Sequence, residues 1–192
     1  LYSSAASDVY KRQIGALIGL AICSPLFLVI SILITYQSNG PIFFRQIRIG
    51  YKGRPFAIFK FRTMSSIVEE EGPQLVAKCD SSNSTRLEQF LRGHHLDELP
   101  QLWNVLRGDM SFVGPRPERK YFIDKILRHT DRYQLIYEMK PGLTSEATLY
   151  NGYTDTMEKM LKRMEMDIHY LEHRTLWLDF TIIVKTVVNI LT

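Results

Sequence analysis

The sequence lacks the features of several common protein classes. Its two cysteines, Cys23 and Cys79, are too few for a disulfide framework, and no cluster of Cys and His has the spacing of a metal site. No GxxxxGKS or GxxxxGKT motif is present, which argues against a P-loop nucleotide-binding protein. Within these residues there is no internal repeat and no sign of a second domain. These absences favour one compact domain in a reducing compartment.

Neither sign of charge is in large excess. The 192 residues carry 24 Lys and Arg against 20 Asp and Glu, a formal net charge of +4 at pH 7. This imbalance is compatible with an anionic partner such as a phosphate, a lipid headgroup or nucleic acid, but it is too small to choose among them. Hydrophobic residues make up 45% of the chain, so the composition is not that of a disordered protein.

Residues 1–13 (LYSSAASDVYKRQ) show no helical or alternating pattern of apolar residues. Residues 3–13 resemble the translation of a sequencing-library adapter joined to a truncated reading frame. We therefore interpret residues 1–13 as a non-native leader and exclude them from the fold. The alternative is a native flexible tail.

Residues 14–34 (IGALIGLAICSPLFLVISILI) form an uncharged run of 21 residues. As a helix it is roughly 32 Å long, enough to cross a hydrocarbon core of about 30 Å. Pro25 near its centre removes a backbone donor and kinks or breaks a helix, and the Ser24 hydroxyl can donate to a carbonyl left free. The run predicts either a kinked span or a re-entrant helix-break-helix hairpin that enters and leaves by one face. A buried core helix of a soluble protein is the alternative.

A basic segment follows the apolar run. Between Thr35 and Met64 there are six basic residues and no acidic one. The positive-inside rule places this side in the cytoplasm. Residues 41–50 and 55–64 are rich in β-formers and flank Tyr51–Arg54, which predicts a β-hairpin next to the membrane. Its basic side chains form either a solvated face or a surface for headgroups and phosphates.

The rest of the chain is predicted to be mainly helical. Residues 65–84 are acidic and polar, which predicts a loop or lid. Residues 176–191 are apolar except for Asp179 and Lys185, which predicts a core helix or a helix lying in the membrane interface. The other predicted helices cover 86–92, 98–107, 117–139 with an interruption near Thr130-Asp131, and 155–173, whose Met-rich stripe is typical of a core.

The adjacent carboxylates Asp97 and Glu98 are candidates for catalysis. Pro100 fits a helix only in its first turn, so a helix is predicted to start near Asp97. The positive end of that helix favours ionised carboxylates, as a nucleophile or a metal ligand requires, and predicts lowered pKa values. The common alternative is an acidic helix cap without a catalytic role.

Cations are predicted to lie near these carboxylates. Arg116 stands between two prolines in SFVGPRP (111–117), which stiffen the backbone around a planar, permanently charged donor. Lys60 and Arg62 are two residues apart on the predicted strand, so their side chains are expected on one face. Carboxylates beside several cations favour phosphoryl chemistry with a divalent ion, because positioning and charge neutralisation drive such reactions.

Five segments carry a resemblance to a known family. They are, in order, the apolar run with Ser24-Pro25, FKFRTM (59–64), LDELPQLWNV (96–105), GDMSFVGPRP (108–117) and KPGLT (140–144). Together they resemble the bacterial sugar transferase family, the monotopic polyprenyl-phosphate phosphoglycosyl transferases. The resemblance covers nearly everything from Ile14 onward.

The resemblance implies an enzyme of class EC 2.7.8 that uses Mg²⁺. Such an enzyme transfers a sugar phosphate from a nucleotide sugar, expected to be UDP-linked, to undecaprenyl or another polyprenyl phosphate, the initiating membrane step of polysaccharide or glycoconjugate assembly. Asp97 matches the nucleophile that forms a covalent phosphosugar intermediate, and Glu98 matches the Mg²⁺ ligand. Ser24-Pro25 matches the break of the re-entrant hairpin. By their motifs, three cations match phosphate or nucleotide contacts: Lys60, Arg62 and Arg116.

The expected fold class is α+β, mainly helical. Behind the leader (1–13), residues 14–34 are expected to form the re-entrant membrane hairpin. Residues 35–192 are expected to form a single cytoplasmic catalytic domain, at the bacterial inner membrane, with the membrane-adjacent β-hairpin and amphipathic interfacial helices. Expected partners are a nucleotide sugar, polyprenyl phosphate and membrane lipid, and not nucleic acid.

Two segments depart from the usual pattern of the family. Ser145–Gly152 differs from the residues that usually follow KPGLT in this family, so the resemblance does not identify the sugar. The sequence identifies neither the pathway nor the oligomeric state. His94-His95 stands where the family often has a hydroxyl residue just before the two carboxylates Asp97 and Glu98. We assign no role to these histidines. Two other functions remain: a metal-dependent phosphohydrolase at the membrane, and a non-enzymatic anchor that binds acidic lipid through residues 45–62.

Overall fold

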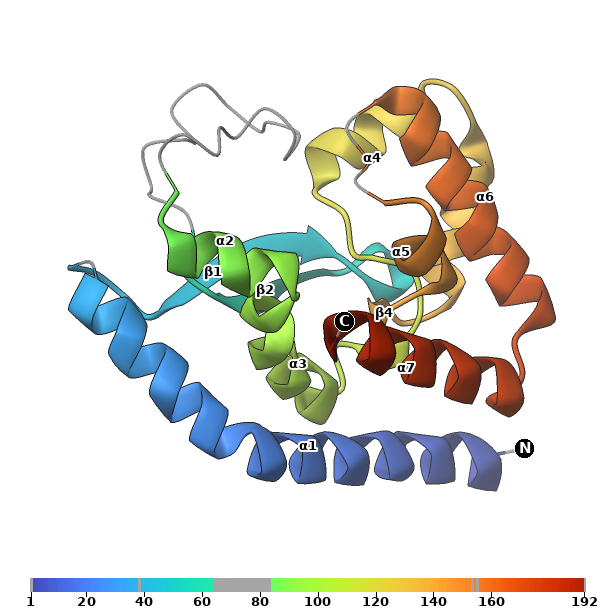
Figure 1. Ribbon diagram of the computed structural model, residues 1–192. Helices are drawn as coiled ribbons and strands as arrows, with labels where there is room; N and C mark the ends of the chain where they lie inside the picture. Colours follow the sequence, from blue (N-terminus) through green and yellow to red (C-terminus); the bar gives the residue numbers. More distant parts are fainter. Residues whose placement is uncertain (1, 38, 64–83, 153, 155, 192) are drawn as a thin grey trace.

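The computed structural model describes residues 2–37, 39–63, 84–152, 154 and 156–191 (Figure 1). Among these residues the fold is mostly helical, with two small two-stranded sheets, as the α+β prediction expected. Residues 64–83, which include Met64 and nearly all of the expected loop or lid, lie outside the described residues.

The first element, α1, is one long helix from Tyr2 to Gln37. Its first turns correct the expectation that residues 2–13 lack helical structure. A helix is costly to nucleate but adds one hydrogen bond for each further residue, so polar residues next to an apolar helix can extend it. The stretch Val9–Gln37 is long and apolar enough to cross a membrane.

Pro25 lies inside α1 without ending it. Proline at this position cannot donate to the carbonyl of Ala21, four residues earlier. The Ser24 hydroxyl donates to that same Ala21 oxygen at 2.8 Å, which confirms that Ser24 replaces the missing donor. Figure 1 shows α1 bending near its middle, so the helix is kinked while its helical structure continues.

Both halves of α1 pack against the rest of the protein. Before the kink, Ala16 is buried in a cluster with Ile58, Val105 and Met110. After it, Ile30 and Ile34 are buried in a second cluster that includes Phe61 and Leu91. The helix therefore lies along the body of the protein on both sides of Pro25, at the lower edge of the molecule in Figure 1.

The predicted β-hairpin is confirmed. Strands β1 (Phe43–Ile49) and β2 (Pro55–Phe61) pair antiparallel, with Phe43 opposite Phe61 and Ile49 opposite Pro55. A short 3₁₀ turn, η1 (Tyr51–Gly53), joins them. The second sheet is a parallel pair of short strands, β3 (Ser111–Val113) and β4 (Gly142–Thr144).

The helices after the hairpin follow the sequence prediction, except that two segments are 3₁₀ helices and the short helix α5 (Glu146–Tyr150) was not predicted. The predicted helix over 98–107 begins as a 3₁₀ helix, η5 (Leu96–Gln101), and continues as α3 (Leu102–Arg107). The predicted segment 117–139 forms α4 and a 3₁₀ helix, interrupted at residues 128–130. The other elements are α2 (Arg86–Gly93), α4 (Lys120–Leu127), η6 (Asp131–Glu138), α5 (Glu146–Tyr150), α6 (Met157–His173) and α7 (Leu176–Leu191).

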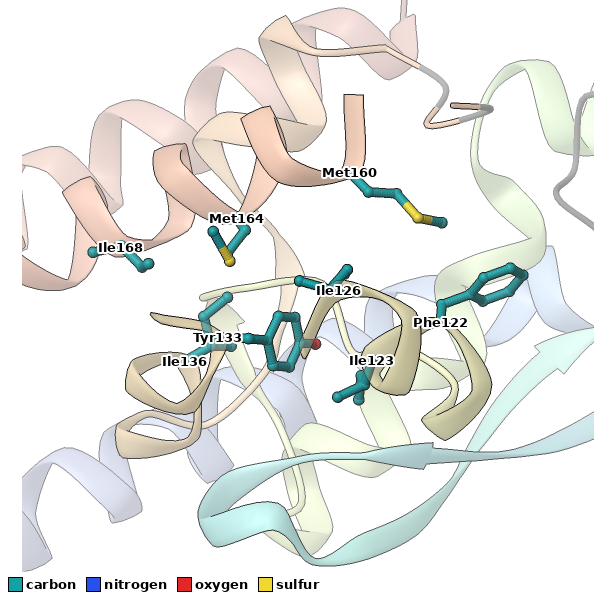
Figure 2. Packing of buried hydrophobic residues seen from close by; sticks show 8 residues of the cluster. All are labelled: Phe122, Ile123, Ile126, Tyr133, Ile136, Met160, Met164 and Ile168. Carbon is teal, nitrogen blue, oxygen red and sulfur yellow. The ribbon is translucent and has the colours of Figure 1, made fainter. Parts of the chain in front are cut away.

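The largest apolar cluster lies between α4, η6 and α6 (Figure 2). Met160, Met164 and Ile168 of α6 face Ile126 and Tyr133 there. This confirms the core interpretation of the Met-rich stripe. Ile126, Tyr133 and Met160 of this cluster also line a small cavity next to Arg116.

Candidate active site

Glu98 lies at the centre of a charged cluster formed by three separate segments. Lys60, on β2, donates from Nζ to Glu98 Oε1 at 2.6 Å. Arg116, in the loop after β3, donates from its two terminal nitrogens to Oε1 at 2.7 Å and to Oε2 at 3.2 Å. The structure thus brings together Glu98, Lys60 and Arg116, which the sequence placed in different motifs.

Asp97 and Glu98 are both buried, with 7% and 8% of their surfaces exposed. Arg116 and Lys60 hold the pKa of Glu98 well below its usual range, although burial opposes them. For Asp97 burial dominates and raises the pKa to about 6, while Lys60 and Arg116 act against that shift. The expectation of a lowered pKa is therefore confirmed for Glu98 and wrong for Asp97. The cost of burying the Asp97 charge outweighs the nearby cations and helix end.

Asn104 holds the segment that carries Asp97 and Glu98 next to strand β2, which carries Lys60. It is fully buried on α3, where its Nδ2 donates to Ala57 O at 2.8 Å and its Oδ1 accepts from Phe59 N at 3.2 Å. These bonds place the start of α3, and with it η5, beside β2. Asn104 stood inside the recognised motif, but its role depends on a partner 45 residues earlier, which spacing does not reveal.

Arg62 does not join this cluster. Arg62 lies one residue beyond the end of β2, although its amide still donates to Ile42 O at 2.9 Å. Its guanidinium donates to Asn39 O at 3.1 Å, near the end of α1. Lys60 and Arg62 therefore bind different partners, Glu98 and Asn39 O.

A second charged cluster is centred on Glu118, two residues after Arg116. Glu118 accepts a hydrogen bond from Arg163 of α6 and forms an ion pair with Arg48 of β1, 3.6 Å away. The side chains of Arg48, Glu118 and Arg163 are all less than one fifth exposed. Sequence reasoning missed these residues, because Arg48 and Arg163 reach Glu118 from elements far apart in the chain.

Comparison with known proteins identifies the family. The family model described as bacterial sugar transferase matches residues 6–192. A Caulobacter vibrioides protein named UDP-glucose:undecaprenyl-phosphate glucose-1-phosphate transferase is 40% identical over 193 residues, covering 97% of this chain and 72% of that protein. The chain belongs to the bacterial sugar transferase family.

Two longer relatives carry different sugar names. An Aeromonas hydrophila protein named UDP-N-acetylgalactosamine-undecaprenyl-phosphate N-acetylgalactosaminephosphotransferase is 38% identical over 179 residues. A Klebsiella pneumoniae protein named UDP-glucose:undecaprenyl-phosphate glucose-1-phosphate transferase is 39% identical over 184 residues. Each match covers 93% of this sugar transferase chain and about two fifths of the relative (42% and 39%). Similarity at this level therefore does not select the sugar.

The Asp97 and Glu98 carboxylates are oxygen ligands of the kind that Mg²⁺ prefers, provided that phosphates and water complete the coordination of the ion. Among the described residues no group of three or more His, Cys, Asp or Glu side chains converges on one point. Mg²⁺ is usually held by one or two carboxylates, waters and substrate phosphates, which Asp97 and Glu98 can satisfy. Both oxygens of Glu98 are engaged by cations, so a metal ligated by Glu98 has to share or displace them.

Proposed function

We propose that this chain transfers a sugar phosphate from a UDP-sugar to undecaprenyl phosphate through a covalent intermediate on Asp97. The observation that carries the proposal is the buried Asp97 next to Glu98, which binds both Lys60 and Arg116, in a chain of the bacterial sugar transferase family. The names of the relatives supply the two substrate classes.

The reaction proceeds in two displacements. A carboxylate oxygen of Asp97 attacks the β-phosphorus of the UDP-sugar, and the bond from that phosphorus to the oxygen bridging it to the α-phosphate breaks. UMP leaves with the bonding electrons, and the sugar phosphate stays on Asp97. An oxygen of undecaprenyl phosphate then attacks the same phosphorus and releases the Asp97 carboxylate. Splitting one transfer in this way is covalent catalysis.

Lys60 and Arg116 have a direct role in this scheme. The diphosphate gains negative charge on its leaving oxygen as UMP departs, and fixed cations stabilise that charge most effectively in a site shielded from water. Arg116 presents a planar fork suited to phosphate oxygens, and Lys60 contributes a single charged point. Both cations are paired with Glu98, and the ionised Asp97 supplies the second negative charge that brings the buried site close to charge balance.

Mg²⁺ is the proposed cofactor, with Glu98 as its ligand. When bound, the metal ion neutralises charge on the diphosphate. Glu98 would hold the ion, and because Lys60 and Arg116 would then share the Glu98 oxygens with it, donors of both cations would be available to substrate phosphate. Arg62, held at Asn39 O, has no proposed contact with phosphate.

The arrangement of α1 supports a re-entrant membrane helix. Because Ala16 on one side of Pro25 and Ile34 on the other both pack on the same body, the two ends of the helix stay near one face of the protein. If α1 crossed the membrane completely, the half of the helix on one side of Pro25 would lose its contacts with the rest of the protein. Large apolar side chains remain exposed along the outer face of α1: Ile14, Leu17, Ile18, Ile22, Leu28, Val29 and Ile32.

Helix α7 supplies a second apolar surface suited to the membrane interface. Leu176 and Trp177 are 83% and 75% exposed, and Phe180, Val184 and Val187 are exposed after them. A helix with one packed face and one exposed apolar face lies along a bilayer surface, with tryptophan at headgroup depth. We place the catalytic domain on the cytoplasmic face, following the basic residues between Thr35 and Met64.

The activity test measures UMP release from a panel of UDP-sugars with undecaprenyl phosphate and Mg²⁺. The wild type is expected to release UMP with at least one sugar, and Asp97→Asn to release none. Undiminished release by Asp97→Asn overturns the proposal. Continuous turnover without any lipid acceptor supports a phosphohydrolase instead. Salt-sensitive binding to acidic vesicles, unaffected by Asp97→Asn and without turnover, supports a lipid-binding anchor.

The topology test uses single cysteines at the two ends of α1. Tyr10→Cys and Gln37→Cys, in a background without Cys23 and Cys79, report the two exposed ends. In the re-entrant arrangement, a reagent that cannot cross the inner membrane labels neither cysteine in intact cells and both after permeabilisation. Labelling of one end in intact cells shows a full span.

A further inference from the structure

Arg116 is held by a loop whose backbone is fixed on both sides. The Arg116 side chain is 31% exposed and contacts Glu98 through its two terminal nitrogens. Its direction toward Glu98 therefore depends on where the backbone of residues 114–118 lies. Two groups of contacts determine that position.

The first group comes from β4, in the KPGLT motif. The Gly142 amide donates to Pro115 O at 2.9 Å, and the Gly114 amide donates to Thr144 O at 3.0 Å. No side chain fits between these strands. A Cβ built on Gly142 lies 2.5 Å from Gly114 O and 2.6 Å from Thr144 O, both backbone atoms that cannot turn aside. The absence of a side chain at Gly142 is what lets β4 approach the Arg116 loop.

The second group comes from β1 and α6. The carboxylate of Glu118 binds Arg163 and Arg48, and its carbonyl oxygen accepts from the Ile49 amide at 3.0 Å. The Arg48 guanidinium also donates to Pro117 O at 3.4 Å. These bonds fix the backbone just after Arg116, as β4 fixes it just before.

We propose that Gly142 and Glu118 are positioning residues that hold the Arg116 fork against Glu98 from the two sides of its loop. The inference rests on the proposed transfer reaction, because Arg116 is assigned there to the substrate phosphates. Neither residue touches the reacting atoms. Their effect on catalysis passes through Arg116, and this distinguishes them from residues that only stabilise the fold.

The test is a pair of double-mutant cycles scored by kcat for UMP release. Gly142→Ala and Glu118→Gln are each made in the wild type and in Arg116→Lys, which keeps the charge but loses the planar fork. In the wild type each is expected to lower kcat about 10-fold or more, since misplacement of a catalytic group is costly. In Arg116→Lys, where the placed fork is already lost, each is expected to lower kcat less than about 2-fold.

Matched controls separate positioning from general damage. Gly93→Ala adds a Cβ where no atom lies within 4 Å, and Glu165→Gln removes a charge from an exposed pair with Arg132. Both are expected to leave kcat unchanged in both backgrounds. Where Gly142→Ala does not fold, the Glu118→Gln cycle decides the proposal, because glutamine keeps the size of the side chain but has only one acceptor oxygen for the two arginines.

The outcomes are distinct. Equal fold losses in the wild type and in Arg116→Lys contradict positioning through Arg116 and leave the transfer reaction standing. A wild type that releases no UMP from any sugar overturns the transfer reaction and this inference with it. A loss confined to the wild-type background confirms that the two sides of the loop act through Arg116.

Discussion

The Arg116 guanidinium meets the Glu98 carboxylate with two hydrogen bonds, one to each oxygen, at 2.7 and 3.2 Å. This bidentate geometry needs a planar fork, which lysine does not have. Arg116→Lys is therefore expected to lower kcat roughly 10- to 100-fold, less than the roughly 100- to 1,000-fold loss when a donor to a reacting oxyanion is removed, because lysine keeps the charge.

The control for that substitution is Arg132→Lys, in the exposed pair with Glu165. It should leave UMP release unchanged, because exposed ion pairs contribute little and this one lies outside the site. Full activity of Arg116→Lys contradicts the role assigned to the fork.

Asn104 is expected to matter mainly for stability. Asn104→Ala leaves two groups without these partners, the Ala57 carbonyl and the Phe59 amide, at a cost of about 1–3 kcal/mol for each buried polar group left unmade. Urea unfolding in detergent measures the loss. Asn151→Ala, which removes an exposed bond to Lys159 O, serves as the control and should change the midpoint little.

Asp167 gives a pH dependence that can be tested apart from the catalytic site. Burial raises the pKa of this carboxyl from 3.8 to about 7. The groups that face it are Arg163 on its own helix, Glu118 in the loop after β3, and Ser145 and Glu146 at the start of α5. Since the folded state binds the proton more tightly than the unfolded state, ionisation of Asp167 lowers stability as pH rises from about 4 to 7.

Asp167→Asn removes that cost and keeps an oxygen that accepts from Ser145. Its free energy of unfolding relative to the wild type should rise between pH 4 and 7, by a few kcal/mol at most, and level off above pH 8. Unfolding in detergent across this pH range provides the measurement. A difference that stays constant with pH contradicts the raised pKa.

Removal of divalent cations should abolish turnover without unfolding the protein. Asp97 and Glu98 provide too few ligands for a structural metal site, so the ion is expected to bind together with the diphosphate. Treatment with EDTA should stop UMP release and leave the thermal midpoint unchanged, and added Mg²⁺ should restore release. Continued turnover in excess EDTA contradicts a metal-assisted step.

Local patterns in the sequence predicted much of the fold. Alternation and turn residues predicted the β1–β2 hairpin, and the Ser24-Pro25 pair predicted a kink with a replacement donor. The helical extension before Gln13 was not predicted, because a helix can propagate into residues that carry no pattern of their own.

The candidate site was predictable only where its residues stood in recognised motifs. Lys60 and Arg116 were found in this way, and both reach Glu98. Arg62 stood in a recognised motif too, but its guanidinium donates to Asn39 O, a contact that the motif does not reveal. Glu118 and Asn104 were missed because their partners come from distant segments, and the pKa of Asp97 depends on burial that the sequence does not state.

Asp97 is proposed to carry the sugar phosphate as a covalent intermediate, and intact-protein mass spectrometry detects such an adduct directly. The purified protein is incubated with the UDP-sugar it uses and Mg²⁺, without undecaprenyl phosphate. We expect one added sugar phosphate per chain, located at Asp97, lost when undecaprenyl phosphate is added and absent from Asp97→Asn. A wild type that transfers the sugar phosphate efficiently without ever carrying this adduct, or an adduct of the same size on Asp97→Asn, contradicts the account.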